Sequence, residues 1–223
     1  VCRFDGSELA TFTSADGLLS ASVNCIYEGS DGVTWFGTSK GISRFDGKTF
    51  VNLNRADGLP HENIVGITGG PDGTLWILTG GGGLLRYDEK AFYSLTTQDG
   101  LAGNSTFAIE PDPDRNLWFG AGQINLPGGI SRFDGHTVTD FGAQMNWPKG
   151  WYTALRWDRH GSLWFGLYGQ GLYRFDGRGL TNMFADQIKS IIALDVDQDG
   201  SIWFGPSAQS ALGVYRYDGE RLL

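Results

Sequence analysis

Cysteine and histidine are scarce in this chain of 223 residues, which holds two cysteines and three histidines. Cys2 and Cys25 cannot form a disulfide framework, and we interpret both as small packing thiols. The histidines are His61, His136 and His160, and their positions give no metal-binding or catalytic spacing. We therefore predict no metal site, no cofactor and no catalytic residue.

An excess of basic residues and long apolar runs are also missing. Lys and Arg number 17 against 25 Asp and Glu, which gives a formal net charge of −8. This balance argues against a nucleic-acid partner, because phosphates need a basic stripe, and against an anionic membrane surface. No run approaches the roughly 18 apolar residues of a membrane span. The chain begins at Val1 without a signal-peptide pattern, and we expect a mature form or a piece of a longer chain.

Proline is rare and glycine is abundant, with 7 and 35 residues, which indicates many tight turns rather than disorder. Segments with sustained helical periodicity are missing, and this disfavours a fold of alternating strands and helices. The remaining pattern consists of short strands separated by turns. We predict an all-β protein.

One short phrase recurs along the chain. The stretch GISRFDG occurs at 41–47 and again at 129–135, and related copies place an arginine at intervals of 41, 42, 46, 42 and 42 residues. A phrase such as LWFG keeps the same period. A repeat near 42 residues with one Trp strand per unit is typical of a β-propeller blade. The repeated arginines are Arg3, Arg44, Arg86, Arg132, Arg174 and Arg216, and the tryptophans are Trp35, Trp76, Trp118, Trp164 and Trp203.

Each unit is predicted to form four short antiparallel strands, A to D, with Asp-Gly pairs that suit a two-residue turn between C and D. We predict a β-propeller of five complete blades and an N-terminal half blade, as one domain or propeller fragment over 1–223, and expect it to be part of a larger array. Unpaired strands in the half blade would leave a sheet edge open to self-association. The predicted blades span about 19–53, 60–95, 102–141, 147–184 and 186–223, and the half blade spans 1–12.

These phrases resemble the repeats of the two-component regulator propeller family. The matching stretches are DGL at 16–18, 57–59 and 99–101, WFGTSKGISRFDG at 35–47 and GSLWFGLYGQGLYRFDG at 161–177, and the resemblance covers essentially the whole chain. The fourth and fifth units depart from it, with NWPKG at 146–150 and DQIKS at 186–190 where DGL is expected. The resemblance implies a bacterial sensor propeller, periplasmic or extracellular, that is the input module of a two-component regulator and detects glycans.

Residues that every blade carries are poor candidates for a unique site, so we interpret the repeated Arg, Trp and Asp-Gly as scaffold. The loops that differ in length are informative, because the distance from Trp to Arg across the B–C loop is 9, 10, 14, 10 and 13 residues. In an up-and-down blade the B–C and D–A loops share one face, opposite the A–B and C–D hairpins. We predict that this face carries the ligand site.

The loops of unusual length or composition belong to neighbouring blades, the third to the fifth. Long B–C loops at 120–129 and 205–213 flank a D–A loop at 144–152 that is rich in aromatic residues. Aromatic faces beside amides suit the apolar face and the hydroxyls of a sugar, so we predict a non-catalytic site for a carbohydrate or similar small polar ligand. The alternative is that Trp147 and Trp151 plug the channel or a blade junction. The predicted ligand-binding residues are Trp147, Trp151, Tyr152, Gln123, Asn125, Tyr168 and His61.

Two other functions stay open from the sequence, a lyase or hydrolase by analogy of fold and a protein–protein scaffold. An enzyme would have to draw its acids and bases from His61, Glu62, Lys149 and Asp186. Two further motifs carry little weight. GTSKG at 37–41 matches a nucleophile elbow but falls on a predicted hairpin, and DVDQDG at 195–200 matches the start of a calcium loop whose closing glutamate is missing.

Overall fold

The computed structural model describes residues 1–4, 6–70, 73–185, 187–207 and 213–223. The all-β prediction is confirmed, because the sheets are antiparallel and join strands that follow one another in the sequence. The chain divides into two compact units, Val1–Thr96 (unit 1) and Thr97–Leu223 (unit 2). Each unit is described by itself, and the organisation of all blades as one domain stays a prediction. Within the described ranges, no helix has the length and apolar character needed to cross a membrane.

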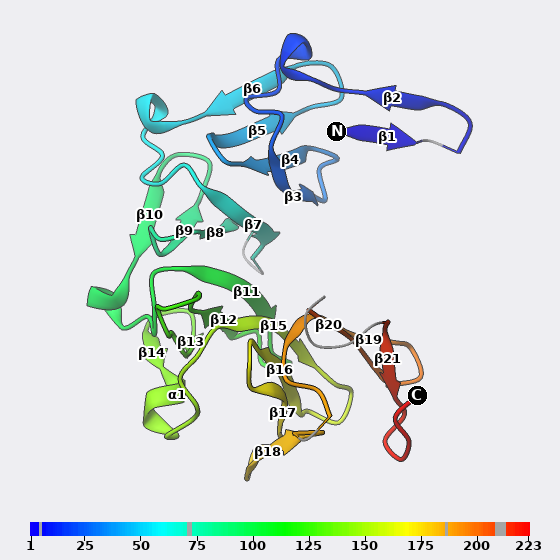
Figure 1. Cartoon of the computed structure of the whole chain (residues 1–223). Coiled ribbons are helices and arrows are strands. Elements are labelled where there is room, and N and C mark those ends of the chain that lie inside the picture. Colours follow the sequence, from blue (N-terminus) through cyan, green and yellow to red (C-terminus); the bar gives the residue numbers. More distant parts are fainter. Residues whose placement is uncertain (5, 71–72, 186, 208–212) are drawn as a thin grey trace. The chain divides into compact units, whose positions relative to one another are not determined.

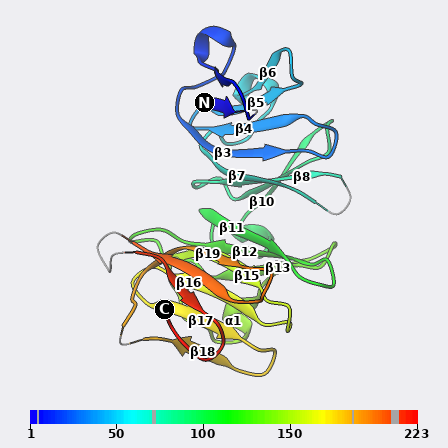
Figure 2. The same cartoon turned by 90° about the vertical axis from the view of Figure 1, so that its right-hand side faces the viewer.

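Unit 1 contains two four-stranded blades and a separate hairpin (Figure 1 and Figure 2). The hairpin, called here the N-terminal hairpin, consists of β1 (Cys2–Phe4) and β2 (Leu9–Thr11). Blade 1 consists of β3 (Val23–Glu28), β4 (Thr34–Thr38), β5 (Gly41–Phe45) and β6 (Phe50–Leu53). Blade 2 consists of β7 (Ile64–Gly69), β8 (Leu75–Thr79), β9 (Leu84–Tyr87) and β10 (Phe92–Leu95).

Unit 2 contains three blades. Blade 3 consists of β11 (Thr106–Pro111), β12 (Leu117–Ala121), β13 (Ile130–Phe133) and β14 (Val138–Asp140), and blade 4 of β15 (Tyr152–Trp157), β16 (Leu163–Leu167), β17 (Gly171–Phe175) and β18 (Leu180–Met183). Blade 5 has only β19 (Ile191–Val196), β20 (Ile202–Pro206) and β21 (Tyr215–Tyr217). The prediction of a full fourth strand here is corrected: beyond the Asp-Gly turn, Tyr217 forms a bridge with Leu222, and Arg216 and Leu223 exchange backbone hydrogen bonds of 3.0 and 2.9 Å.

The second strand of a blade is its most buried element. All residues of β8, β12 and β16 are buried, as expected for strands that pack on both faces. The repeated tryptophan of this strand pairs in register with the repeated arginine of the third, as in Trp35 with Arg44 and Trp164 with Arg174. The Arg44 guanidinium lies 5.8 Å from the centre of the Trp35 ring, and the corresponding distance for Arg174 and Trp164 is 5.6 Å. The repeated arginine is therefore a packing partner of the repeated tryptophan.

The connections between blades explain the DGL motif. In unit 1 a 3-10 turn (Ser14–Asp16, Arg55–Asp57) ends at a glycine with positive φ, 107° at Gly17 and 88° at Gly58. The following leucine is buried, with an exposed fraction of 2% at both Leu18 and Leu59. Unit 2 begins with the same arrangement at Thr97–Asp99. The glycine permits the left-handed turn that sends the leucine back into the core.

A β-bulge interrupts the start of every first strand. The pairing register shifts on either side of one residue, which in blade 1 is Asn24 and in blade 4 is Thr153. Asn24 Nδ2 donates to the Ile64 carbonyl at 2.8 Å, and Thr153 Oγ1 donates to the Ile191 carbonyl at 2.5 Å. In blades 1 and 4 the bulge therefore directs one side chain toward the backbone of the next blade.

Charged side chains join the first strands of unit 2. Arg156 on β15 lies 3.3 Å from Glu110 on β11 and 3.1 Å from Asp195 on β19. Burial raises the pKa of Glu110, and the nearby Arg156 guanidinium opposes that rise. The sequence analysis did not identify this contact, which spans three consecutive blades.

Candidate functional site

Variable loops of blades 3 and 4 lie together in unit 2. Gly128 and Gly150 exchange two backbone hydrogen bonds, of 2.9 and 3.2 Å, which join the B–C loop of blade 3 to the D–A loop before blade 4. Gln170 Nε2 donates to the Lys149 carbonyl at 2.9 Å, and the Tyr168 amide donates to the Trp151 carbonyl at 3.0 Å. We call residues 121–129, 147–151 and 167–170 the loop cluster.

Glycine is required where these loops approach most closely. Gly122 has a φ of 123°, and a Cβ added there would collide with the Gly150 carbonyl oxygen. A Cβ added at Gly128 would collide with the backbone of Ala121. The glycines of the stretch GAGQINLPGG therefore allow two backbones to come into contact.

Trp151 is the central aromatic residue of the loop cluster. Its ring centre lies 5.1 Å from that of Tyr168 and 5.4 Å from that of Phe107, and all three side chains are half-buried. The Nε1 atom of Trp151 is buried and has no hydrogen-bond partner among the described residues. Leaving a buried donor unpaired costs about 1–3 kcal/mol, and such groups are found at functional sites.

Phe107 was not among the predicted site residues. It is the bulge residue of β11, at the place that Asn24 and Thr153 take in their blades. An alignment of the five first strands places these residues in one column. This aligned position identifies Phe107 as a site residue only once the bulge is known to direct its side chain toward the next blade.

Amide groups lie next to the aromatic residues. Gln123 and Leu126 exchange backbone hydrogen bonds of 2.9 and 3.0 Å and form a tight turn. Asn125 is exposed at this turn with a φ of 67°, a conformation that asparagine tolerates well. Gln123 is half-buried, and Ile124 is exposed. The loop thus presents an amide and apolar atoms to solvent.

The structure places Trp147 and Tyr152 in the core of unit 2, away from solvent. Trp147 is 7% exposed and stacks on Phe165 with ring centres 5.2 Å apart. Tyr152 is fully buried, its hydroxyl donates to the Pro148 carbonyl at 2.7 Å, and burial raises its pKa. Neither side chain offers a surface to a ligand, so both are left out of the site proposed below.

The burial of Trp147 has a local cause. It lies five residues before β15, as Leu59 lies five residues before β7, and its amide donates to the Gly142 carbonyl at 2.8 Å. The short helix α1 (Phe141–Gln144) replaces the 3-10 turn, and Asn146 has a φ of 54° where the connections before blades 1, 2 and 3 have glycine. The stretch MNW at 145–147 therefore takes the place of the DGL motif, and Trp147 occupies the position of its buried leucine.

His61 belongs to unit 1 and the other predicted residues belong to unit 2. It is half-buried, its Nδ1 has no hydrogen-bond partner among the described residues, and a Cβ added at Gly82 would collide with it. The glycine run at 80–83 therefore makes room for this histidine. Residues 208–212 of the predicted loop 205–213, and Asp186, lie outside the described residues.

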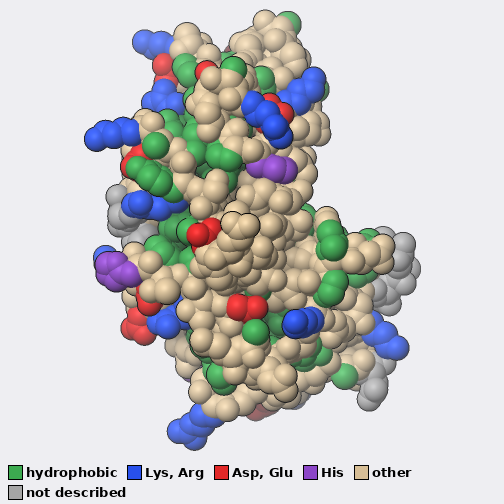
Figure 3. Space-filling view, turned by 90° about the vertical axis from the view of Figure 1, so that its left-hand side faces the viewer, with side chains coloured by type: hydrophobic (Ala, Val, Ile, Leu, Met, Phe, Trp, Pro, Cys, Tyr) green, Lys and Arg blue, Asp and Glu red, His purple; other side chains and the backbone are tan. Residues whose placement is uncertain are grey.

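The two weak motifs have structural explanations. Ser39 of GTSKG lies in a turn between β4 and β5, with a strand and no helix after it. Asp197 of DVDQDG accepts a hydrogen bond of 2.7 Å from Trp203 Nε1 and another of 2.9 Å from the Ser201 amide. The described residues contain no group of three His, Cys, Asp or Glu able to hold a metal. On the face shown in Figure 3 the Lys and Arg side chains are dispersed.

The fold and the repeated contacts define the class of protein, an all-β chain built from propeller blades. The repeat is also matched by a family model. Residues 17–40, from the DGL motif through the Trp strand of blade 1, match the model of the two component regulator propeller. The resemblance predicted from the sequence is thereby confirmed in this segment. No curated relative matches the chain.

Solved structures support the same fold. A domain described as the extracellular part of a hybrid two component system from B. thetaiotaomicron is similar, with a TM-score of 0.70 and 24% identity over 91% of this chain and 30% of its own. A second such domain from that organism has a TM-score of 0.73 and 21% identity over 96% and 29%. This chain therefore spans less than a third of either domain. Both are described as extracellular domains, and the periplasmic or extracellular location of this chain stays a prediction.

Virginiamycin B lyase from Staphylococcus aureus, in an inactive form with quinupristin, is similar as well. Its TM-score is 0.67 and its identity is 15%, over 91% of this chain and 69% of the lyase. At such identities the similarity to all three structures concerns the fold alone.

Proposed function

We propose that the chain is the sensing part of an extracytoplasmic two-component regulator and that it binds a carbohydrate or similar polar ligand at the loop cluster. The similarity in fold to extracellular domains of hybrid two component systems supports the sensing role. The observation that carries the site is the half-buried pair of Trp151 and Tyr168, with ring centres 5.1 Å apart, within loops that contacts between blades hold in place.

The chemistry of the loop cluster suits a sugar. The rings of Trp151 and Tyr168 supply flat apolar surface for the C–H face of a pyranose. Asn125 and Gln170 are exposed, and each amide can both donate to and accept from a hydroxyl. A few polar groups beside aromatic surface are typical of small-ligand sites.

Oligosaccharide arrays followed by calorimetry test the proposal. For a ligand found with the unaltered chain, Trp151→Ala should weaken binding at least about tenfold, because a central aromatic contact commonly contributes more than 1 kcal/mol. Trp151→Phe should retain part of the affinity. Tyr93→Ala, which removes an aromatic side chain that is 50% exposed in unit 1, is the matched control and should bind normally. Unchanged affinity of Trp151→Ala for the same ligand would remove this site.

The loop cluster is not proposed as a catalytic centre. Of the four acids and bases that an enzyme would need, His61 and Glu62 belong to unit 1 and Lys149 to unit 2, and Asp186 lies outside the described residues. The Glu62 carboxylate lies 3.4 Å from Arg55, in an exposed ion pair. The similarity to a lyase is one of fold, and no contact among the described residues adds a reaction to it.

A further inference from the structure

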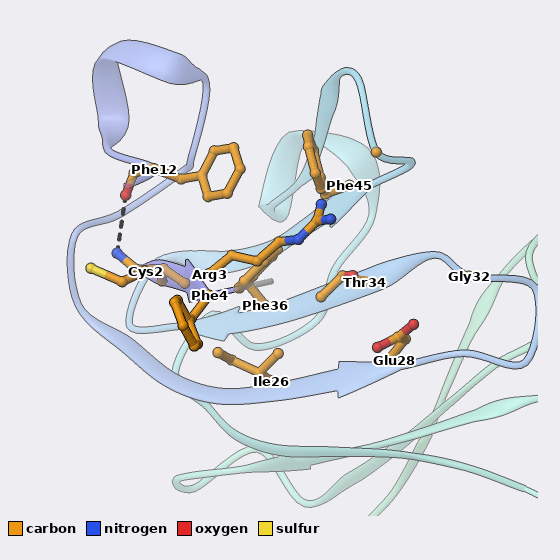
Figure 4. A pocket seen from close by; sticks show the side chains of 12 residues that line it. Cys2, Arg3, Phe4, Phe12, Ile26, Glu28, Gly32, Thr34, Phe36 and Phe45 are labelled. Carbon is orange, nitrogen blue, oxygen red and sulfur yellow. Dashed lines mark hydrogen bonds between the residues drawn. The ribbon is translucent and has the colours of Figure 1, made fainter. Parts of the chain in front are cut away.

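A pocket of about 610 Å³ lies beside the N-terminal hairpin of unit 1, and its lining includes Phe4, Ile26 and Phe36 (Figure 4). A second pocket of unit 1, of about 280 Å³, lies between blade 1 and blade 2 and is called here the interblade pocket. Residues between 27 and 35 of blade 1 and residues 69–70, 73–75, 87 and 89 of blade 2 form it. Its lining thus comes from the side of the A–B and C–D turns, whereas the loop cluster consists of B–C and D–A loops.

Glycines border the interblade pocket where unit 2 has large side chains. Asp112 begins the A–B turn of blade 3 and Gly29 that of blade 1, and both amides donate to the carbonyl four residues later at 2.8 Å. Trp157 ends β15 and packs on Trp118 of blade 3, with ring centres 5.6 Å apart. The corresponding last residue of β7 is Gly69. The interblade pocket therefore lies where the junction of blades 3 and 4 holds an aspartate and a tryptophan.

Trp35 lacks the hydrogen-bond acceptor that its counterparts in unit 2 have. Trp118, Trp164 and Trp203 each donate from Nε1 to the aspartate that begins the A–B turn, at 3.0, 2.8 and 2.7 Å. The Trp35 side chain is only 6% exposed, yet among the described residues none accepts from its Nε1. Glycine at position 29 removes the carboxylate, and the pocket beside it leaves space for an acceptor from another molecule.

The Arg44 guanidinium lacks the same partner. Arg132 and Arg216 lie 4.0 and 3.8 Å from the aspartates that bond their tryptophans. Arg44 lies 5.8 Å from the centre of the Trp35 ring, as those arginines lie over theirs, but it forms no ion pair with a described residue. Two neighbouring donors of blade 1 therefore point to one anionic acceptor, a carboxylate by comparison with unit 2.

The rest of the lining suits a positive group. Asp31 and Glu89 contribute carboxylates, and the described residues of the lining include no Lys or Arg. The rings of Tyr27 and Tyr87 line the pocket as well, and Tyr87 packs against Trp35 with ring centres 6.1 Å apart. Carboxylates and aromatic faces both attract ammonium groups. A ligand with a carboxylate alone would be repelled by the two acids, so the occupant carries both charges.

Glu89 lines the pocket in a conformation that is costly for a residue with a Cβ. Its φ is 69°, at the second position of the C–D turn of blade 2. The same position in the other blades holds Gly47, Gly135, Gly177 and Gly219. Strained residues of this kind cluster at ligand sites, and the strain here places a carboxylate beside the pocket.

We propose that the interblade pocket binds a free α-amino acid. The carboxylate of the amino acid accepts from Trp35 Nε1 and pairs with Arg44, in the place that an aspartate carboxylate takes in unit 2. Asp31 and Glu89 hold the ammonium group beside the Tyr87 ring. The site is separate from the loop cluster, so it adds a second ligand class to the one proposed above.

Nuclear magnetic resonance of the tryptophan indole N–H groups tests the proposal on the intact chain. The probes are the standard amino acids, added singly at millimolar concentration, and sodium acetate at the same concentration. The Trp35 signal, assigned with Trp35→Phe, should move downfield with at least one amino acid, because its N–H gains a charged acceptor. Trp118, Trp164 and Trp203 already have acceptors, so their signals should stay in place and are the internal controls.

Variants at Gly29 sharpen the test. Gly29→Asp gives blade 1 the acceptor of unit 2, so it should move the Trp35 signal without ligand and abolish the response to amino acids. A Cβ at this position would collide with Asp31 Oδ1, the end of a side chain that is free to turn away. Gly29→Ala is the matched control, because it adds the Cβ without an acceptor and should leave the signal of the ligand-free chain in place. Glu89→Gly should weaken the binding of the amino acid about threefold, as expected for an exposed ion pair.

Three outcomes would overturn the proposal. The first is a Trp35 signal that no amino acid moves. The second is an equal shift with acetate, which would leave the ammonium group without a role, and this comparison decides even if Gly29→Asp fails to fold. The third is a folded Gly29→Asp variant that still responds. The readout contains no sugar, so failure here leaves the function proposed for the loop cluster unaffected.

Discussion

The turns between the first and second strands differ between the two units although their backbones agree. In blades 1 and 2 the amides of Gly29 and Gly70 donate to carbonyls four residues later, at 2.8 and 2.7 Å. In blade 4 the Asp158 amide makes the same bond at 2.9 Å, and its carboxylate also accepts from Trp164 Nε1 at 2.8 Å. Asp112 and Asp197 do the same for the tryptophans of blades 3 and 5.

The comparison separates two tasks of the repeat. The backbone hydrogen bond that closes the turn forms with glycine at its first position, and in blade 1 Asp31 Oδ1 also accepts from the Val33 amide at 3.1 Å. The aspartates of unit 2 add an acceptor that fixes the tryptophan ring, and the Arg156 contacts to Glu110 and Asp195 add ties between blades. The additional side-chain bonds are found in the unit that holds the loop cluster.

The largest effect is expected at the D–A connection of blade 4. Replacing Trp147 by alanine should lower the free energy of unfolding of unit 2 by about 3–5 kcal/mol, since a large side chain leaves a buried site. Trp147→Leu should be much milder, because Leu59 fills the same place in unit 1. Urea unfolding followed by circular dichroism measures both variants. Equal losses would show that Trp147 does more than fill the leucine position.

The second largest effect is expected at the turn between the first and second strands of blade 4, where Asp158 stands in place of glycine. Asp158 is 8% exposed and accepts from the His160 and Ser162 amides as well as from Trp164. Asp158→Ala should lower the free energy of unfolding by about 3 kcal/mol, because three donors, two of them buried, lose their acceptor. Asp158→Asn keeps an acceptor oxygen for the backbone and should lose less. A loss below about 0.5 kcal/mol for Asp158→Ala would contradict this expectation. It would mean that the aspartate carboxylate adds little to stability, as at the blade 1 turn, where Gly29 takes the same position.

The smallest effect concerns acid. The pKa of Asp197 is lowered, chiefly by the hydrogen bond from Trp203, so its stabilising contribution is present above the unfolded pKa of about 3.9. That contribution is lost as pH falls through the lower folded pKa. Asp197→Asn should therefore show a shallower decline of unfolding free energy below about pH 4. Unfolding curves from pH 2 to 6 test this, and parallel declines in both proteins would contradict it.

Acid sensitivity common to both units has another source. Asp46 in unit 1 and Asp176 in unit 2 sit at C–D turns, and backbone hydrogen bonds lower the pKa of each. These turns are repeated, so they contribute the same background to every blade. The Asp197→Asn comparison is therefore made against the unaltered chain and not between units.

Much of the fold could be predicted because the repeat consists of residue types that favour particular strands and turns. Trp-centred strands nine residues after an Ile or Leu, followed by Arg-aromatic-Asp, indicated the order of the strands in each unit, and the structure then gave their register. The fourth strand of blade 5 was predicted wrongly, since RLL has the composition of a strand but pairs with β21 only as a bridge between Tyr217 and Leu222 and through Arg216 and Leu223. The helix α1 was missed because four residues give no periodicity.

The candidate site was predicted only in part. The position of the loops followed from their unequal lengths, and Trp151, Tyr168, Gln123 and Asn125 are all in the loop cluster. The direction in which each side chain of the loop points could not be predicted from the sequence. Trp147 and Trp151 are four residues apart in one loop, yet one packs in the core and the other is half-buried beside Tyr168. Composition could not separate them, whereas alignment of Trp147 with Leu59 would have done so.

The reciprocal bonds between Gly128 and Gly150 have a mechanical consequence. Blades 3 and 4 contact each other through side chains such as Arg156 and Glu110, and here their loops are also linked by main chain, so the loops cannot separate without rupturing both bonds. A molecule that displaced Trp151 would pull on the blade before it as well as on its own. Occupancy at one aromatic side chain would thus be transmitted as the movement of a two-blade segment.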